Sequence, residues 1–337
     1  MSVSIKAISY YLPKNITDNE ALSRLFPEWS ADAIEQKTGI RQRHVCDWDE
    51  IASDCAVKAA EKLFEEYQID RQGIEFVLFC TQTPDYASPT TACLIQKRLG
   101  LPNNVGALDI NLGCSGFVYS LSVAKGLIAG VGVENVLLLT SEVLTKYIHP
   151  KDRSSRTLFG DAGAATLLCR SGEEGEGIGN FVFGTEGRDD DTMILRNRGF
   201  RYPLLNVSGL DYQDGYGNTF NDTYFHMDGP AVFVFALKQV PPMIADLLSR
   251  NCCTMDDIDL FVFHQANAYI LEALRRKLKI DADRFFVCLR DVGNTVSSTL
   301  PIALYEAERC GKIKKGNRVL LAAFGVGLSW AGTIIQY

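Results

Sequence analysis

The chain carries an internal repeat, which limits the folds open to it. Residues 159–168 (FGDAGAATLL) return in similar form as residues 324–335 (FGVGLSWAGTII). The neighbouring apolar runs recur in the same order: 261–264 matches 77–80, 285–289 matches the run before Cys114, and 318–322 matches 135–139. Such a repeat predicts two similar α/β units. We expect one half over residues 1–172 and another over 173–337, each with helices over a mostly parallel sheet.

Length and composition fit two units of this kind. The chain has 337 residues, of which 47% are hydrophobic, enough for two ordinary cores. The run IEFVLFC at residues 74–80 shows no alternation, which is typical of a strand covered on both faces. Between residues 171 and 226 the composition turns polar and glycine-rich. We interpret this segment as loops that form pocket walls rather than as a disordered linker, because it contains many aromatic residues.

Charge and cysteine usage exclude several classes of function. The net charge of −7 and the pI near 5.3 argue against nucleic acid or an anionic membrane as a partner. The ten cysteines form no CxxC pair and the four histidines lie far apart, so no metal site is predicted. The first residues, MSVSIKAISYYLPKN, lack the long apolar core expected of a leader peptide, and no run of about 18 apolar residues occurs in the sequence. These features predict a protein of the reducing cytoplasm.

Cys114 lies at a predicted turn between a strand and a helix. The apolar run 105–112 is broken by Gly113-Cys114-Ser115-Gly116, and apolar residues then recur every three or four positions. The free N–H groups at a helix start favour a thiolate over a thiol. Two flanking glycines allow a sharp turn and a close approach of substrate. The motif therefore predicts a nucleophile, although a buried structural cysteine has the same signature.

His264 and Asn294 follow strands of the second half that correspond to those around Cys114. His264 ends a strand in HQAN, and Asn294 lies in GNTVSSTLP after the next one. Because carboxyl ends of strands meet at one edge, the three side chains are expected to converge at one crevice. A cysteine can be acylated by a thioester, while imidazole and carboxamide N–H groups hold an enolate oxygen. The backbone N–H groups of Cys114 and of Val326 are the predicted oxyanion hole.

Four motifs carry a resemblance to a known family. NLGCSG, HQAN, GNTVSSTLP and FGVGLSW, in this order, resemble the β-ketoacyl-[acyl-carrier-protein] synthases III of the thiolase superfamily, which serve fatty acid biosynthesis. The resemblance implies a duplicated, five-layer α/β/α/β/α fold and a homodimer. It implies that Cys114 accepts the acyl primer, and that His264 and Asn294 drive decarboxylation of malonyl-carrier protein. Substrates would be thioesters of CoA or phosphopantetheine, with no metal and no bound organic cofactor.

Departures from the family pattern bear on the primer. Family members often stack the CoA adenine on a tryptophan where this chain has Ala33, and Lys37 replaces a frequent arginine. Arg153 matches a family contact to CoA. Ser88 aligns with a bulky phenylalanine that often closes the acyl pocket across the dimer. The resemblance therefore implies a primer longer or bulkier than acetyl.

The predicted carrier-protein face departs from the pattern as well. Arg276 and Lys277 match basic family positions, whereas Tyr269 and Val234 stand where relatives carry Arg and Lys. A basic patch suits an acidic carrier protein, although charge runs are usually only solvated faces. We expect a specialised acyl carrier protein as the partner.

Three other functions stay open at this point. A cysteine hydrolase of the papain type also runs Cys, His and Asn in chain order, but CSGF lacks the tryptophan of its signature. An acyltransferase or a condensing enzyme of secondary metabolism would keep the fold. A non-catalytic subunit is disfavoured, since it would more often have lost Cys114.

Overall fold

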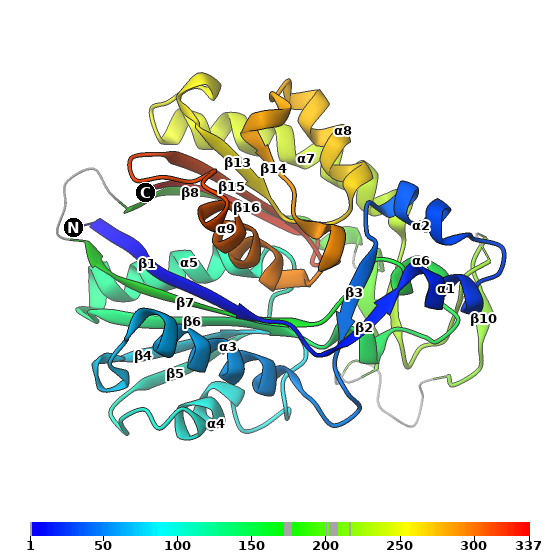
Figure 1. The fold of residues 1–337 in the computed structure, drawn as a ribbon, viewed down its shortest axis with the longest axis horizontal. Helices are drawn as coiled ribbons and strands as arrows, with labels where there is room; N and C mark the ends of the chain where they lie inside the picture. The colour runs from blue at the N-terminus through cyan, green and yellow to red at the C-terminus, as the bar shows by residue number, and fades with distance from the viewer. Residues whose placement is uncertain are drawn as a thin grey trace.

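Two five-stranded sheets form the frame of the molecule (Figure 1). The computed structural model describes residues 2–171, 177–189, 191–197, 199, 201, 208–215 and 217–337. The first sheet has the order β1 (Ser2–Tyr11), β7 (Ala162–Ser171), β6 (Asn135–Glu142), β4 (Phe76–Cys80), β5 (Gly106–Ile110). The second has the order β8 (Gly177–Thr185), β16 (Ser329–Gln336), β15 (Arg318–Gly325), β13 (Leu260–Phe263), β14 (Phe285–Phe286). The two orders correspond strand by strand, which confirms the duplicated fold.

The sheets are mixed, but four of the five strands in each run in the same direction, so the expectation of mostly parallel sheets is confirmed. In the first sheet β4 pairs in parallel with β5 and β6, whereas β7 is antiparallel to both β6 and β1. The second sheet repeats this pattern. Helices cover the antiparallel strands on both faces too, so their sequences are as evenly apolar as those of buried parallel strands.

Helices make up the other three layers (Figure 1). Between the sheets lie α5 (Gly116–Gly126) and α9 (Thr299–Arg309). The outer face of the first sheet is covered by α3 (Ala52–Tyr67) and α4 (Thr91–Arg98), and that of the second by α7 (Gly229–Arg250) and α8 (Ala268–Leu278). Phe117 of α5 and Leu304 of α9 belong to one buried cluster with Leu78 and Val262 of the two sheets. The predicted five-layer order is confirmed.

Short elements complete the described part of the chain. They are β2 (Asn15–Asp18), α1 (Asn19–Leu25), α2 (Ala31–Thr38), β3 (Gln42–Val45), α6 (Arg153–Arg156), β9 (Met193–Leu195), β10 (Tyr212–Gln213), β11 (Thr219–Phe220) and β12 (Phe225–Met227). Four of these, β9 to β12, fall in the segment 171–226 that was predicted to be loop-rich, and β8 belongs to it as well. Residues 172–176 and 202–207 of that segment, and with them the predicted boundary between the halves at 172/173, lie outside the described residues.

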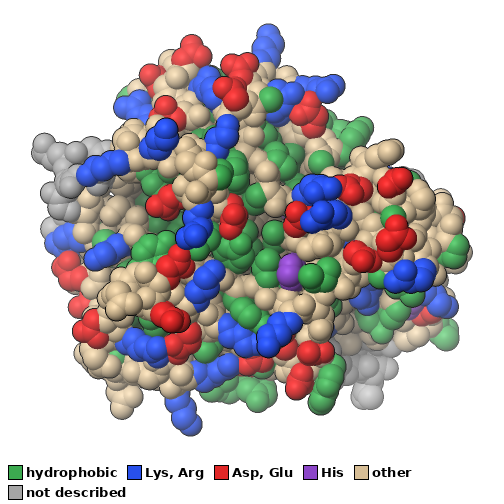
Figure 2. All heavy atoms as spheres, in the orientation of Figure 1, with side chains coloured by type: hydrophobic (Ala, Val, Ile, Leu, Met, Phe, Trp, Pro, Cys, Tyr) green, Lys and Arg blue, Asp and Glu red, His purple; other side chains and the backbone are tan. Residues whose placement is uncertain are grey.

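The surface and the long helix α7 bear on possible partners. Basic and acidic side chains are interspersed over the face seen in Figure 2, which shows no broad field of one sign. Among the described helices, α7 alone is long and apolar enough to span a membrane, by length and composition. Its buried residues, which include Phe235, Val240 and Leu247, pack in the core of the second half. The hydropathy of α7 is therefore explained as that of a core helix.

Candidate active site

Cys114 lies in the turn between β5 and α5, as the sequence predicted. Its side chain is buried, with 3% of its surface exposed. The loop after β15 lies directly against it: a Cβ on Gly325, whose φ is +158°, would stand 2.8 Å from the Cys114 sulfur. Only glycine fits this close approach. A loop from the second half of the repeat thus packs its backbone against the Cys114 sulfur, which belongs to the first half.

The expected thiolate at Cys114 is not what the structure favours. Burial raises the pKa of Cys114 to about 12, and the carboxyl of Glu142 raises it further. Hydrogen bonds from the backbone N–H groups of Val326 and of Cys114 itself lower this pKa, but they do not outweigh desolvation. Shielding of the sulfur from water therefore opposes the stabilisation of a thiolate that the helix start predicts.

These two N–H groups are the predicted oxyanion hole. Both lie close enough to the Cys114 sulfur to lower its pKa. A carbonyl carbon bonded to that sulfur would bring its oxygen close to the same donors. Preorganised N–H donors of this kind stabilise the charge of a tetrahedral intermediate.

His264 follows β13 and is held by a backbone and a side-chain contact. Its N–H donates to the Ala322 carbonyl at 2.8 Å, which extends the pairing of β13 with β15. Its Nδ1 lies 2.7 Å from the Thr299 hydroxyl at the start of α9. Burial lowers the pKa of His264 to about 3, so the imidazole is neutral at physiological pH.

Asn294 is fixed by both its backbone and its carboxamide. Its N–H donates to the Leu158 carbonyl at 2.9 Å, and its carbonyl accepts from Gly160 N–H at 3.0 Å. In the side chain, Oδ1 accepts from Val296 N–H at 2.9 Å, and Nδ2 donates to the Ala266 carbonyl at 3.2 Å. Because Oδ1 faces an N–H donor, the orientation of the amide is set. Its NH₂ group keeps one further proton for a ligand.

Cys114, His264 and Asn294 line one cavity. This cavity of about 60 Å³ runs from the sulfur toward the first turns of α7 and α8, where Gly229 and Asn267 border it. The structure thus brings the three predicted catalytic residues together. A ligand in this cavity would lie beside all three residues.

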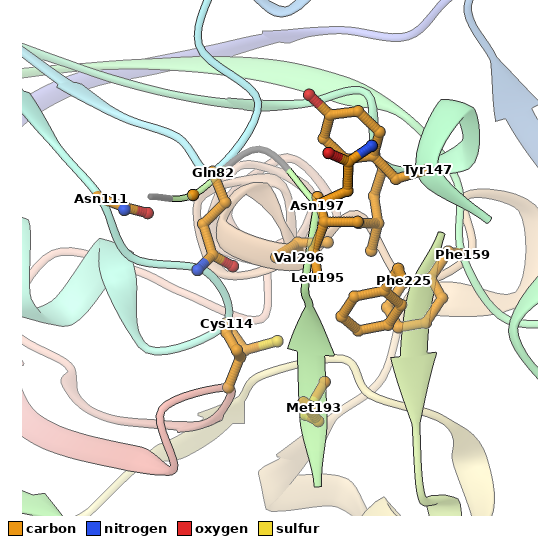
Figure 3. A pocket seen from close by; sticks show the side chains of 13 residues that line it. Gln82, Asn111, Cys114, Tyr147, Phe159, Met193, Leu195, Asn197, Phe225 and Val296 are labelled. Carbon is orange, nitrogen blue, oxygen red and sulfur yellow. The ribbon is translucent and has the colours of Figure 1, made fainter. Parts of the chain in front are cut away.

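A larger cavity also adjoins the sulfur (Figure 3). It has a volume of about 270 Å³, and the Cys114 sulfur points into it. Most of its walls are apolar, and Phe159 and Phe225 lie side by side in one of them. Its polar side chains are Gln82, Asn111, Tyr147 and Asn197. The shape suits an acyl chain attached to the sulfur.

Glu142 and Gln82 are site residues that the sequence analysis missed. The buried Glu142 carboxylate accepts from Gln82 N–H at 2.9 Å and from the Thr83 hydroxyl at 3.0 Å. Burial raises the pKa of Glu142 to about 8. Glu142 thereby holds the segment that carries Gln82, whose side chain points toward Cys114 (Figure 3). The one available signal was an acidic residue at the end of the apolar run NVLLLTSE.

Lys37 and Arg153, predicted to contact CoA, meet at an aromatic ring. The Lys37 ammonium lies 4.2 Å and the Arg153 guanidinium carbon 4.6 Å from the centre of the Trp29 ring. Arg153 also forms an ion pair with Glu28 at 2.8 Å. Ala33, the position where relatives were expected to carry tryptophan, is exposed on α2. The aromatic residue beside the two cations is therefore Trp29.

The remaining predicted residues lie at the surface. Ser88 is exposed in the loop before α4 and does not line the larger cavity of its own chain. Arg276 pairs with Glu272, and the Lys277 ammonium donates to the Leu237 carbonyl of α7.

One group in the described part of the chain has the spacing of a metal site: Cys46, Glu50 and Cys55. It lies apart from both cavities described above. The Lys58 ammonium is paired with Glu50, so the carboxylate already has a cationic partner.

Comparisons with known proteins agree on one family. Residues 108–187 match the family model for 3-oxoacyl-[acyl-carrier-protein] synthase III, and residues 248–337 match the model for its C-terminal part. A β-ketoacyl-[acyl-carrier-protein] synthase III of Caldanaerobacter subterraneus is 35% identical, covering 100% of this chain and 98% of the relative. One from Clostridium perfringens is 34% identical, covering 97% of this chain and 96% of the relative.

Solved structures give the same result. A crystal structure of a 3-oxoacyl-(acyl-carrier-protein) synthase III superimposes with a TM-score of 0.98 at 44% identity, with both chains fully covered. A priming β-ketosynthase from the R1128 polyketide pathway gives a TM-score of 0.87 at 28% identity, covering 99% of this chain and 96% of the other.

Proposed function

Because this chain belongs to the 3-oxoacyl-[acyl-carrier-protein] synthase III family of acyl-transferring condensing enzymes, we propose that it joins an acyl primer on Cys114 to malonyl-[acyl-carrier protein]. Cys114 is the acyl acceptor. His264 and Asn294 act on the malonyl thioester, and the product is a β-ketoacyl thioester on the carrier.

In the first step the Cys114 sulfur attacks the carbonyl carbon of the acyl thioester. The thiol proton passes to Nε2 of His264 and from there to the departing sulfur of the donor, so that a free thiol is released. The N–H groups of Cys114 and Val326 hold the carbonyl oxygen while it carries negative charge. The neutral state of both side chains supports this order of proton transfer.

In the second step the malonyl group loses CO₂, and the electron pair of the broken bond moves onto the thioester enolate. N–H groups of His264 and Asn294 hold the enolate oxygen. The enolate carbon then attacks the acyl carbonyl, and the Cys114 thiolate departs and takes up a proton. The consumed malonyl carboxylate leaves as CO₂, so the new carbon–carbon bond adds two carbons to the primer.

The single observation that carries this proposal is the shared cavity. Cys114, His264 and Asn294 line it together, within reach of one thioester that enters between α7 and α8. A hydrolase needs a path for water but no second donor for an enolate. Simple acyl transfer to an alcohol or amine forms no enolate either, so the Asn294 carboxamide would have no catalytic role in it. The condensing reaction accounts for all three side chains.

We further propose that the primer is larger than acetyl. The cavity beside Cys114 has a volume of about 270 Å³, whereas a three-atom acetyl group at about 30 Å³ per heavy atom fills roughly 90 Å³. Ser88 is exposed, as expected of a residue that reaches the pocket of a partner subunit. The edge strand β5, with Leu108 45% exposed, supports such a homodimer, because unpaired edges favour pairing.

The primer is tested by intact-mass analysis after incubation with acyl donors of increasing length, each offered as the CoA and as the carrier thioester. We expect donors longer than acetyl to label the enzyme at least about tenfold faster than acetyl. Ser88→Phe should reverse this preference, because an aromatic ring fills the volume that serine leaves open. Ser249→Phe on the exposed face of α7 is the matched control. A preference of the unmodified enzyme for acetyl would contradict the proposal.

We also propose a binding site for the CoA of the acyl donor and a docking face for the carrier protein. The Trp29 ring, flanked by Lys37 and Arg153, supports stacking of a CoA adenine with its phosphates on the cations.

The carrier protein docks over α7 and α8, next to the cavity mouth, where Arg276 supplies charge. Beside it Tyr269 stacks on Phe233 with ring centres 5.1 Å apart and is 66% exposed. An apolar centre with a basic rim fits a specialised carrier.

Charge reversal tests the carrier face. Arg276→Glu and Lys277→Glu should each raise KM for the carrier-bound malonyl substrate about threefold to tenfold, with kcat little changed, because both positions face an acidic partner. Lys97→Glu on α4, in the opposite outer layer, makes the same charge change away from this face. Equal KM values for the three variants and the unmodified enzyme would count against docking over α8.

A further inference from the structure

Two carboxamides follow the neighbouring strands β4 and β5 and line the larger cavity beside the sulfur. The last residues of the two parallel strands pair in register. The pairing continues past β4, since Thr81 N–H donates to the Ile110 carbonyl at 3.0 Å. Gln82 and Asn111 come within two residues of these strand ends, and both line the cavity of about 270 Å³ (Figure 3). The sheet therefore places the two carboxamides in the same part of the cavity wall.

Gln82 is held in place next to the nucleophile. Its N–H donates to Oε1 of Glu142 at 2.9 Å, and the neighbouring Thr83 hydroxyl donates to Oε2 of the same carboxylate at 3.0 Å. The Gln82 carboxamide packs against Gly113: a Cβ on Gly113 would overlap its Oε1 and stand 2.7 Å from Cγ1 of Val326. Because Gly113 directly precedes the nucleophile, this carboxamide lies beside the first carbons of an acyl chain bound to the sulfur.

The hydrogen-bonding groups of both carboxamides are unused. In the part of the chain that the structure describes, the side chains of Gln82 and Asn111 have no hydrogen-bond partner, whereas Tyr147 and Asn197 of the same wall have other partners. A plain hydrocarbon chain would cover Gln82 and remove it from water without giving it a partner, which costs free energy. No charged side chain among the described residues lines this cavity, so it suits a polar group without charge.

From this placement we propose that Gln82 and Asn111 select an acyl primer that carries a hydroxyl group on its third carbon. This inference rests on the proposed function. A hydroxyl can donate to the oxygen of one carboxamide and accept from the N–H of the other, whereas a ketone can only accept. A substituent on the second carbon would crowd the carbonyl that the enolate attacks, so the third carbon is the first suitable position. The apolar part of the wall, with Phe159 and Phe225, takes the rest of the chain.

The test compares hexanoyl-CoA with the two enantiomers of 3-hydroxyhexanoyl-CoA, which have the same carbon chain. By intact-mass analysis, one enantiomer should label the unmodified enzyme at least about tenfold faster than hexanoyl-CoA, the effect of about one hydrogen bond.

Gln82→Leu should cancel this preference, and hexanoyl-CoA should label this variant at least as fast as the unmodified enzyme, which shows that the variant is folded. Asn111→Leu should reduce the preference about threefold or more, because one of the two hydrogen bonds is lost. Gln72→Leu is the matched control: Gln72 is exposed near the opposite end of β4, and its replacement should leave the preference unchanged.

Binding gives a second readout that needs no acyl transfer. In Cys114→Ala, the preferred 3-hydroxyhexanoyl-CoA should bind with a Kd at least about tenfold below that of hexanoyl-CoA, and Gln82→Leu in this background should remove the difference. Equal labelling and equal binding of the donors would overturn the proposal, while labelling by hexanoyl-CoA would leave the proposed function standing. A preference that survives in Gln82→Leu would overturn it as well. If no acyl donor labels the unmodified enzyme, the proposed function fails, and the ratio of Kd values still decides the role of Gln82.

Discussion

Replacement of Cys114 by alanine is expected to lower the rate of condensation by at least about 10³-fold and to abolish acyl labelling, because no other side chain can form the acyl-enzyme. Cys80 lies nearby, but its thiol is buried and donates to the Leu112 carbonyl. Intact-mass analysis reports the acyl group, and quantification of the β-ketoacyl product reports the condensation.

The same variant should keep one partial activity. His264 and Asn294 do not depend on the sulfur for their hydrogen bonds, so Cys114→Ala should still release CO₂ from malonyl-carrier protein. This remaining activity separates loss of the nucleophile from misfolding. Cys80→Ala is the matched control and should be labelled like the unmodified enzyme. Labelling of Cys114→Ala at another cysteine would contradict the assignment of the nucleophile.

The fold was predictable from the sequence because duplication appears in the order of apolar runs. The runs at 77–80 and 261–264 became β4 and β13, at equivalent places in the two sheets. Strand direction was not predictable in the same way. β7 and β16 are mostly buried, like the strands that pair in parallel, because helices cover both faces of each sheet, and an evenly apolar run carries no information about direction.

The site was predictable where residues follow strand ends, and less so where contacts depend on tertiary packing. Cys114, His264 and Asn294 each follow a strand, and strand ends meet at one edge. The burial of Cys114 was not predictable, since the loop at Gly325 that lies against its sulfur is remote in the sequence. The contact of Thr299 with His264 was missed for a similar reason, because it joins residues that are 35 positions apart along the chain.

Trp29 shows a different limit of predicting site residues from the sequence. The sequence places Ala33 at the expected aromatic position when counted back from Thr38, but the ring that meets Lys37 and Arg153 comes from the segment before α2. Counting along a chain assumes equal loop lengths. A side chain from a neighbouring segment can fill the same space, so an apparent loss of a residue type is a weak argument until the geometry is known.

Asn294→Asp is expected to separate the two half-reactions. Aspartate has the same shape, and one of its oxygens can still accept from Val296 N–H. Its second oxygen cannot donate, so it loses the contact to the Ala266 carbonyl and repels an enolate oxygen. Loss of a preorganised donor costs about 10²- to 10³-fold in rate, and we expect at least this loss in CO₂ release and in condensation. Measurement of released CO₂ follows the malonyl step, and intact-mass analysis of Cys114 follows acylation.

Acylation by the primer should change by less than about tenfold in this variant, because the attacking sulfur and its base are untouched. Asn317→Asp provides the matched control: the Asn317 side chain accepts from Lys314 N–H in an exposed turn, a contact that aspartate keeps. If Asn294→Asp slowed acylation and CO₂ release to the same extent, Asn294 would serve the shape of the site rather than the enolate. A loss confined to CO₂ release and condensation assigns the carboxamide to the malonyl step.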